Sequence, residues 1–152
     1  MILSAVFLLG GCTSSSPSNG QFFTVADAEW HYGQTFTLNA ERDTMYETGD
    51  IIDLTVRHTG GYSYANLWVE LSYTSNDSVV ADTFNIAITD NYGKWIGRGS
   101  GSIITRTESL SPRLTPDCNS LFGVRHIMRV DVLDDVEQIG IVLRKPESDD
   151  SL

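Results

Sequence analysis

The residues best suited to chemistry lie near the start of the sequence. An apolar run over residues 2–9 ends at Leu9 and is followed by two glycines and Cys12. A thiol that comes after an apolar residue and two small ones is typical of a site that a peptidase cuts and a diacylglyceryl group modifies. The run is too short to span a bilayer as a helix, which needs about 20 residues. We therefore expect a signal peptide over residues 1–11 and lipidation of Cys12.

The alternative is an ordinary signal peptide that happens to be followed by a cysteine. An A-x-A cleavage site would favour it, but the small residues here end directly at Cys12. Residues 13–21 contain no apolar side chain, so we expect residues 12–21 to form a flexible tether. The first predicted partner is thus the lipid bilayer, through acylated Cys12. At about 0.8 kcal/mol per buried methylene, three acyl chains would make the anchor permanent.

The other titratable residues form no recognisable catalytic or metal-binding motif. His31, His58 and His126 lack the spacing of metal ligands, and the position of His126 on an apolar strand face predicts a core histidine. A cluster of acidic residues lacks the regular oxygen spacing of a calcium loop and predicts a solvated turn: Asp131, Asp134, Asp135 and Glu137. No serine lies in a nucleophile-elbow motif. We predict no catalytic residue, no metal, no cofactor and no enzymatic activity.

Composition limits the partners further. Once Cys12 carries lipid, only Cys118 remains, so an intramolecular disulfide and a cysteine-based zinc site are both excluded. The net charge is −10, from 20 acidic and 10 basic residues, which argues against nucleic acid and against anionic lipid headgroups. The mature chain of 141 residues (152 − 11) has the length of a single domain with one core.

Aromatic side chains provide the one binding signal. Tyr62, Tyr64 and Trp68 lie close together in the sequence, and Trp68 faces away from its apolar neighbours. Trp95 precedes three glycines at period two, which leave one face of a strand bare for another group to pack on: Gly97, Gly99 and Gly101. The four aromatic residues form a candidate binding surface, since sugar-binding sandwiches stack sugar rings on such side chains. Burial in the core is the alternative that we favour.

The elements that must position these residues are strands. Apolar and polar residues alternate at period two in five segments: 52–57, 67–74, 84–89, 124–132 and 139–143. Turn-forming clusters separate them at 47–50, 59–61, 74–77 and 90–93. This pattern predicts an all-β fold, an antiparallel β-sandwich of jelly-roll-like arrangement over residues 22–146. Closure into a barrel is left as an alternative.

Three segments depart from the strand pattern. Residues 133–137 are expected to form a single helical turn between the last two strands. Residues 105–121, which include Pro112, Pro116 and Cys118, predict a long loop that is either functional or mobile. Residues 147–152 predict a disordered acidic tail.

Short motifs in a fixed order complete the pattern. They are the cysteine motif at Cys12, residues 57–59 at a strand end, residues 62–69, Asp82-Thr83, residues 90–99 (Asp-x-x-Gly-x-Trp-x-Gly-x-Gly) and Ile139-Gly140-Ile141. Together they resemble the gliding-motility lipoprotein GldH family of Bacteroidetes, over roughly residues 30–145.

The resemblance implies a cell-envelope lipoprotein that is an accessory of a gliding apparatus and acts through contacts with other envelope proteins. That family carries no established catalytic residues, so none is transferred. Residues 13–16 lack the acidic side chains found after the cysteine of many Bacteroidetes surface lipoproteins. The periplasmic face of the outer membrane is therefore expected. The rival function is a membrane-anchored glycan-binding module.

Overall fold

The computed structural model describes residues 18–37, 46–111, 113–118 and 120–147. Almost all of their regular structure is extended. The elements, in chain order, are β1 (Ser18–Thr24), the short 3-10 helix η1 (Ala26–Ala28), β2 (Glu29–His31), β3 (Phe36–Thr37), β4 (Ile51–Thr59), β5 (Asn66–Ser75), β6 (Ser78–Ala87), β7 (Arg98–Ser100), β8 (Ile103–Ser109), β9 (Gly123–His126), β10 (Val132–Asp134) and β11 (Val136–Arg144). No helix among these residues is long and apolar enough to cross a membrane.

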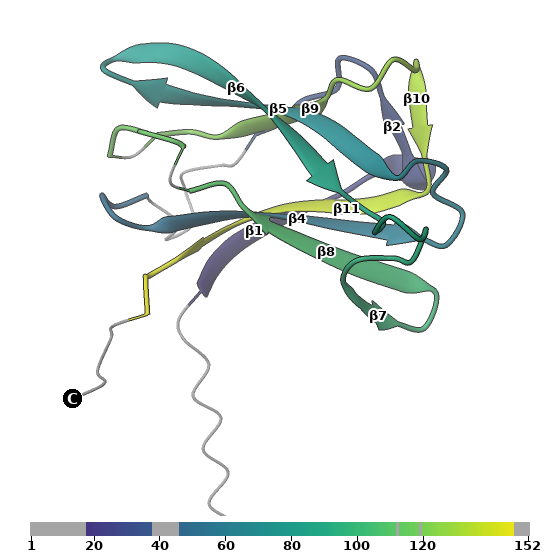
Figure 1. Cartoon of the computed structure of the whole chain (residues 1–152). Coiled ribbons are helices and arrows are strands. Elements are labelled where there is room, and N and C mark those ends of the chain that lie inside the picture. Colours follow the sequence, from purple (N-terminus) through teal and green to yellow (C-terminus); the bar gives the residue numbers. More distant parts are fainter. Residues whose placement is uncertain (1–17, 38–45, 112, 119, 148–152) are drawn as a thin grey trace, which may run out of the picture.

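Two antiparallel sheets lie face to face (Figure 1). The five-stranded sheet has the order β1-β11-β4-β8-β7, and the four-stranded sheet has the order β3-β9-β5-β6. Strands β2 and β10 form a separate two-stranded ladder. Each larger sheet ends in an edge strand on both sides, so the described strands form an open sandwich. The prediction of an all-β antiparallel sandwich is confirmed.

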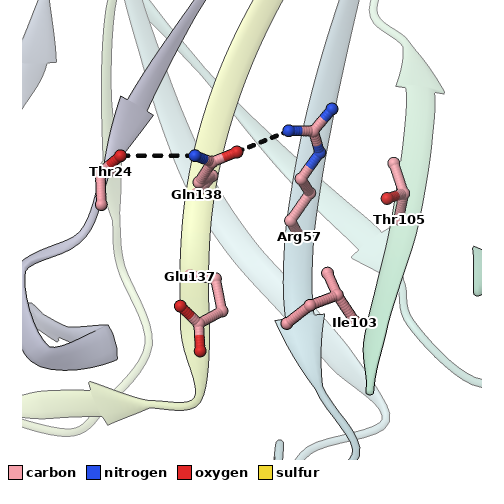
Figure 2. Close-up of a pocket in the computed structure, with 6 residues that line it drawn as sticks. All are labelled: Thr24, Arg57, Ile103, Thr105, Glu137 and Gln138. Atoms are coloured by element: carbon pink, nitrogen blue, oxygen red, sulfur yellow. Dashed lines mark hydrogen bonds between the residues drawn. The ribbon is translucent and has the colours of Figure 1, made fainter. Parts of the chain in front are cut away.

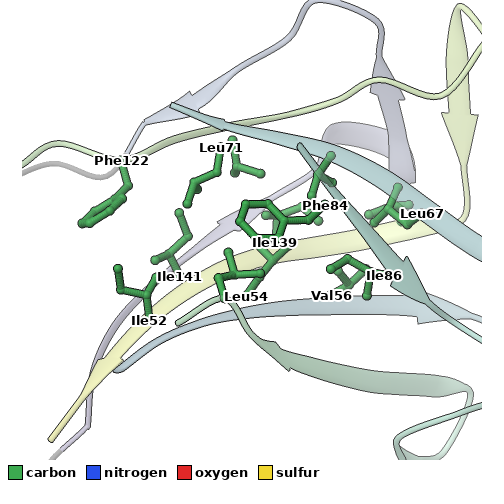
Figure 3. Packing of buried hydrophobic residues seen from close by; sticks show 14 of the residues in the cluster. Ile52, Leu54, Val56, Leu67, Leu71, Phe84, Ile86, Phe122, Ile139 and Ile141 are labelled. Carbon is green, nitrogen blue, oxygen red and sulfur yellow. The ribbon is translucent and has the colours of Figure 1, made fainter. Parts of the chain in front are cut away.

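The core lies between the two sheets, where the period-two pattern places one apolar face of each strand (Figure 3). Strands β4 and β11 contribute a continuous set of aliphatic side chains from one sheet, and β5 and β6 contribute another from the other sheet. The largest fully buried members include Ile52, Leu54, Leu67, Leu71, Ile86, Ile139 and Ile141. Burial of each such side chain stabilises the fold by about 1.5–3 kcal/mol.

The longest hairpin joins β5 and β6 through Asn76 and Asp77. These residues have φ values of 50° and 58°, which is the backbone of a type I′ turn, the turn that matches the twist of the strands. The carboxylate of Asp117 accepts hydrogen bonds from the two turn amides, each at 2.9 Å. The segment after β8 is thereby tied to the tip of the hairpin, and the predicted turn at residues 74–77 is present.

The predicted start of the folded domain and the predicted start of the long loop were both wrong. Strand β1 starts at Ser18, which pairs with Arg144, so residues 18–21 belong to the sheet and not to the tether. An edge strand needs only backbone hydrogen bonds to join its neighbour, and polar residues supply these as well as apolar ones. Strand β8 extends to Ser109, so the loop predicted from residue 105 begins after that residue.

The predicted strand over residues 124–132 and the helical turn over residues 133–137 were also wrong. Strand β9 ends at His126, with one further backbone bond from Ile127 to Trp68, and the next strand, β10, begins at Val132. Asp135 then adopts a φ of 66°, and the register between β11 and β4 shifts beside it. Asp135 alone, rather than a helical turn, connects the last two strands, because Asp is one of the few residues that tolerate this backbone, and the bulge follows within β11 between Val136 and Gln138.

Candidate functional site

The structure divides the predicted aromatic surface into exposed and enclosed side chains. Tyr64 and Trp68 are 38% and 40% exposed, whereas Tyr62 is only 4% exposed. Trp95 is half-buried and packs against the core. Of the four candidate residues, Tyr64 and Trp68 present the larger share of their surface to a ligand.

These two side chains line a groove of about 510 Å³, here named the aromatic groove, together with Ile127, Met128, Arg129 and Val130. Trp68 lies on the outer face of the four-stranded sheet, directly opposite Asn85 of β6. The backbone amide of Ile127 donates to the carbonyl of Trp68 at 2.9 Å. This bond holds the chain that follows β9 beside β5, and the groove forms between them.

Tyr62 and Trp95 instead pack around the buried ring of His58. The ring centroid of His58 lies 5.4 Å from that of Tyr62 and 4.9 Å from that of Trp95. The Tyr62 hydroxyl donates to the carbonyl of Asn66 at 2.9 Å. Burial, together with the neighbouring Tyr64, raises the pKa of Tyr62 above its ordinary value. The packing interpretation holds for these two residues.

His58 and His126 are both fully buried, and burial lowers the pKa of each imidazole. Nδ1 of His58 donates to the carbonyl of Thr59 at 2.8 Å, and this bond and the charge of Asp135 partly oppose the shift. His126 packs against the ring of Trp30 at 5.2 Å. Backbone groups nearby oppose its shift, yet neither ring nitrogen has a hydrogen bond of normal geometry within the described residues. The prediction that His126 lies in the core is correct.

No group of three or more His, Cys, Asp or Glu side chains within the described ranges could hold a metal ion. Asp135 is occupied by the neighbouring turn, since its carboxylate accepts from the Thr59 hydroxyl and its carbonyl accepts from the Thr59 amide. Cys118 is exposed, with Sγ 3.6 Å from Oγ1 of Thr48.

Of the three glycines predicted to leave a strand face bare, only Gly97 lies in close contact with another group, and that group is backbone. A Cβ on Gly97 would lie 2.2 Å from the carbonyl oxygen of Thr105 in the neighbouring strand β8. Gly101 adopts a φ of 65° in the turn between β7 and β8. The close approach at Gly97 is therefore between two chain segments, and Trp95 turns towards His58.

A second groove lies on the outer face of the five-stranded sheet. Sequence reasoning missed it. This groove of about 450 Å³, here named the polar groove, is lined by Thr24, Arg57, Ile103, Thr105, Glu137 and Gln138 (Figure 2). Pairing register places Thr24, Gln138, Arg57, Thr105 and Arg98 side by side, one from each strand across the whole sheet. The residues come from five separate segments, so only the strand order brings them together.

Arg57 is the centre of the polar groove. Its Nη1 donates to Oε1 of Gln138 at 2.6 Å, and Nε2 of Gln138 donates to the Thr24 hydroxyl at 3.3 Å. Its Cζ lies 4.5 Å from the ring centroid of Phe22, a cation–π distance. Phe22 in turn lies against Gly140, where a Cβ would come within 2.4 Å of the ring. The guanidinium is held from two sides.

Part of this groove could have been found in the sequence. Arg57 ends the alternating segment 52–57 on its polar face, and a charged residue next to a predicted turn is a reasonable candidate. The neighbours of Arg57 could not have been found, because the order and register of the strands bring them together. Cys12, the remaining predicted site residue, lies outside the described residues.

Comparison with solved structures gives only distant similarities. Dimeric latent PorU from Porphyromonas gingivalis is 14% identical with a TM-score of 0.33, over 91% of this chain and 14% of that one. The VP2 subviral particle of infectious bursal disease virus is 14% identical with a TM-score of 0.33, over 94% of this chain and 37% of that one. The chain thus spans well under half of either protein, and such scores carry no argument about function.

Sequence comparison is decisive. No curated protein sequence matches the chain significantly. The profile of the GldH lipoprotein family, however, matches residues 20–143, a range that contains both grooves and nearly every strand. Membership of a lipoprotein family indicates attachment through lipid to the cell envelope. The chain belongs to the GldH lipoprotein family.

Proposed function

We propose that this protein is a non-enzymatic accessory of a gliding-type envelope assembly, held by lipid on Cys12 at the periplasmic face of the outer membrane. It acts through contacts with other envelope proteins. The family match supports the lipid anchor and the envelope location. The absence of acidic residues from positions 13–16 supports the periplasmic face.

The observation that carries the proposal is the aromatic groove. Tryptophan, tyrosine and arginine contribute most often to the energy of protein interfaces, and this groove combines Trp68, Tyr64 and Arg129. The rest of the outer face of β5 is polar, with Glu70 in an ion pair with Arg125. Trp68 therefore lies in an apolar depression beside a charged surface, as the centre of an interface does.

Site-specific cross-linking in intact cells tests this proposal. A photo-reactive residue at Arg129 should join the protein to a defined envelope protein, and Trp68→Ala should abolish the product. A photo-reactive residue at Tyr92 is the control, because Tyr92 is 96% exposed and lies on a separate turn. Equal products from both positions, or none from Arg129, would contradict a protein interface at the groove.

A second candidate function is glycan binding. It is favoured by the polar residues beside Trp68, where Nδ2 of Asn66 donates to Oδ1 of Asn85 at 2.8 Å. An aromatic ring flanked by amide groups suits a sugar, which offers an apolar face and hydroxyl groups. Titration of the full chain with a panel of oligosaccharides, followed by isothermal titration calorimetry, tests it. A saturable change that Trp68→Phe reduces and Tyr92→Ala leaves intact would favour this function over protein contact.

The location is tested separately. Protease added to intact cells should leave the domain intact, whereas protease added after permeabilisation of the outer membrane should degrade it. Removal of the domain from intact cells would place it on the cell exterior.

A further inference from the structure

The polar groove holds an arginine that forms no ion pair with a carboxylate of the described residues. Four basic side chains within the described ranges form ion pairs with carboxylates: Arg106, Arg125, Arg144 and Lys145. Arg57 forms no ion pair with a carboxylate within the described ranges. It donates instead to the neutral amide of Gln138, although Glu137 lines the same groove. In Figure 2 the carboxylate of Glu137 points away from the guanidinium.

The side chain of Arg57 is preorganised for binding. The stacking on Phe22 and the bond to Gln138 fix the side chain, which lowers the entropy that binding would cost. A guanidinium has five N–H donors, and the bond to Gln138 is the one hydrogen bond that Arg57 makes among the described residues. The remaining donors can form the paired hydrogen bonds that a carboxylate accepts. The hydroxyl of Thr105, next to Arg57 in the register, adds a further donor.

We propose that the polar groove binds a single carboxylate, that of an aspartate or glutamate side chain of a partner polypeptide, with Arg57 as the anchoring residue. This inference rests on the proposed function, since it names the chemistry of a protein contact on the sheet opposite to the aromatic groove. Arg98, at the same position of the register as Thr105, extends the positive surface towards the β7 edge.

The lining of the groove favours this ligand over two others. None of the six lining residues is aromatic, so a sugar ring finds no platform on which to stack. Glu137 lies within the groove and the chain carries a net charge of −10, so a polyanion such as nucleic acid or an anionic membrane is repelled. A single carboxylate on an otherwise uncharged peptide segment needs no aromatic platform, and it is repelled less than a polyanion is. The half-buried Ile103 can contact the methylene groups that precede it.

The test is a titration of the full-length lipidated protein in neutral detergent micelles. The probes are acetyl-glutamate N-methylamide and, as its uncharged counterpart, acetyl-glutamine N-methylamide. NMR follows the Ile103 methyl group and the Arg57 Nε–H. The glutamate probe should give saturable shifts at both positions, and the glutamine probe should bind at least tenfold more weakly.

Variants connect the binding to Arg57. Arg57→Gln should lower the affinity for the glutamate probe at least tenfold. Arg57→Lys should retain intermediate affinity, because lysine keeps the positive charge but lacks the paired N–H donors of a guanidinium. Thr105→Val removes only a hydroxyl group and should weaken binding about threefold, which keeps the test usable if Arg57→Gln does not fold. Lys94→Gln, at an exposed position between β6 and β7 that lines neither groove, removes one positive charge and should bind as the parent does.

Three results would overturn the proposal: equal binding of the two probes, unchanged affinity in Arg57→Gln, or a trimer of galacturonate that saturates the groove at lower concentration than the glutamate probe. The last result would assign the groove to acidic sugars. The titration needs no partner, so its failure leaves the cross-linking at Arg129 unaffected. Failure of the cross-linking likewise leaves the titration standing.

Discussion

Replacement of Gly97 by alanine should destabilise the protein strongly, whereas the same change at Gly99 should not. Gly97 has a φ of +136°, which side-chain-bearing residues rarely adopt, and a Cβ there would lie 2.2 Å from the carbonyl oxygen of Thr105. Gly99 has an ordinary φ, and the nearest atom to its Cβ would be 3.8 Å away. The two positions are two residues apart on the same edge, so each is the control for the other.

The expected magnitude follows from two contributions. Holding alanine in this backbone conformation costs about 1–3 kcal/mol, and relieving the contact with a main-chain oxygen costs about 1–3 kcal/mol more. Gly97→Ala should therefore lower the free energy of unfolding by about 2–6 kcal/mol. Gly99→Ala should leave it unchanged or raise it by about 0.4–1 kcal/mol, because alanine restricts the unfolded chain.

Urea unfolding of the full chain in a mild detergent, followed by tryptophan fluorescence, measures both values. Thermal unfolding should show Gly97→Ala melting about 4–24 °C lower, at about 2–4 °C per kcal/mol. If the two variants differed by less than about 0.5 kcal/mol, a value typical of surface changes, the reasoning would fail. That result would mean that β7 does not approach β8 as closely as the structure has it.

The remaining predictions concern the core, the buried histidines and the free thiol. Ile141→Ala should cost about 2–5 kcal/mol in urea unfolding because it leaves a cavity between the sheets, whereas Val79→Ala, at a site 79% exposed, should change stability by less than about 0.5 kcal/mol. Since burial lowers the folded-state pKa of His58 and His126, the unfolded chain binds more protons, and stability should fall as the pH drops below about 6.5, by up to about 1.4 kcal/mol per pH unit for each histidine. Unfolding of the His126→Gln variant at pH 7.5 and 5.5 should show a smaller loss than the parent; an identical loss would assign the dependence to other groups. Cys118, exposed in the native fold, should react fully with iodoacetamide without denaturant, and slow reaction would show that the thiol is covered.

The sequence was most informative where one face of a strand is buried and the other is not. Residues 52–57 and 67–74 alternate for this reason, and both lie in the predicted strands, β4 and β5. It was least informative where a strand is held by its backbone alone. Strand β1 begins with Ser18, Asn19 and Gly20, whose side chains give no periodic signal. The sequence pattern therefore predicts a tether where the edge of the sheet begins.

The same difference between local sequence pattern and the arrangement of strands explains which parts of the candidate site could be predicted. Trp68 could be placed on the outer face from its alternation with Leu67 and Val69, since that depends on neighbours in the sequence only. The burial of Tyr62 depends on His58 and Trp95. The three residues belong to three different segments, since His58 lies in β4, Tyr62 follows β4 and Trp95 follows β6. Period-two patterning fixes which face a side chain occupies but not which loop covers it. The polar groove needs both strand order and register, and no local pattern contains either.

Both grooves lie at the end of the sandwich opposite to the point where the described chain begins, and this arrangement bears on how a lipid-anchored protein meets a partner. Strand β1 begins at Ser18 and reaches the polar groove at Thr24, about 20 Å further along an extended strand. The aromatic groove follows the turn after Thr59, which ends β4 on the same side (Figure 1). If Cys12 carries the lipid, Ser18 is six residues away from it (18 − 12), and a chain of that length reaches at most about 22 Å, so the beginning of β1 lies close to the bilayer. The two grooves then point into the aqueous space, on opposite sheets, where one partner could contact both or two partners could bind at once.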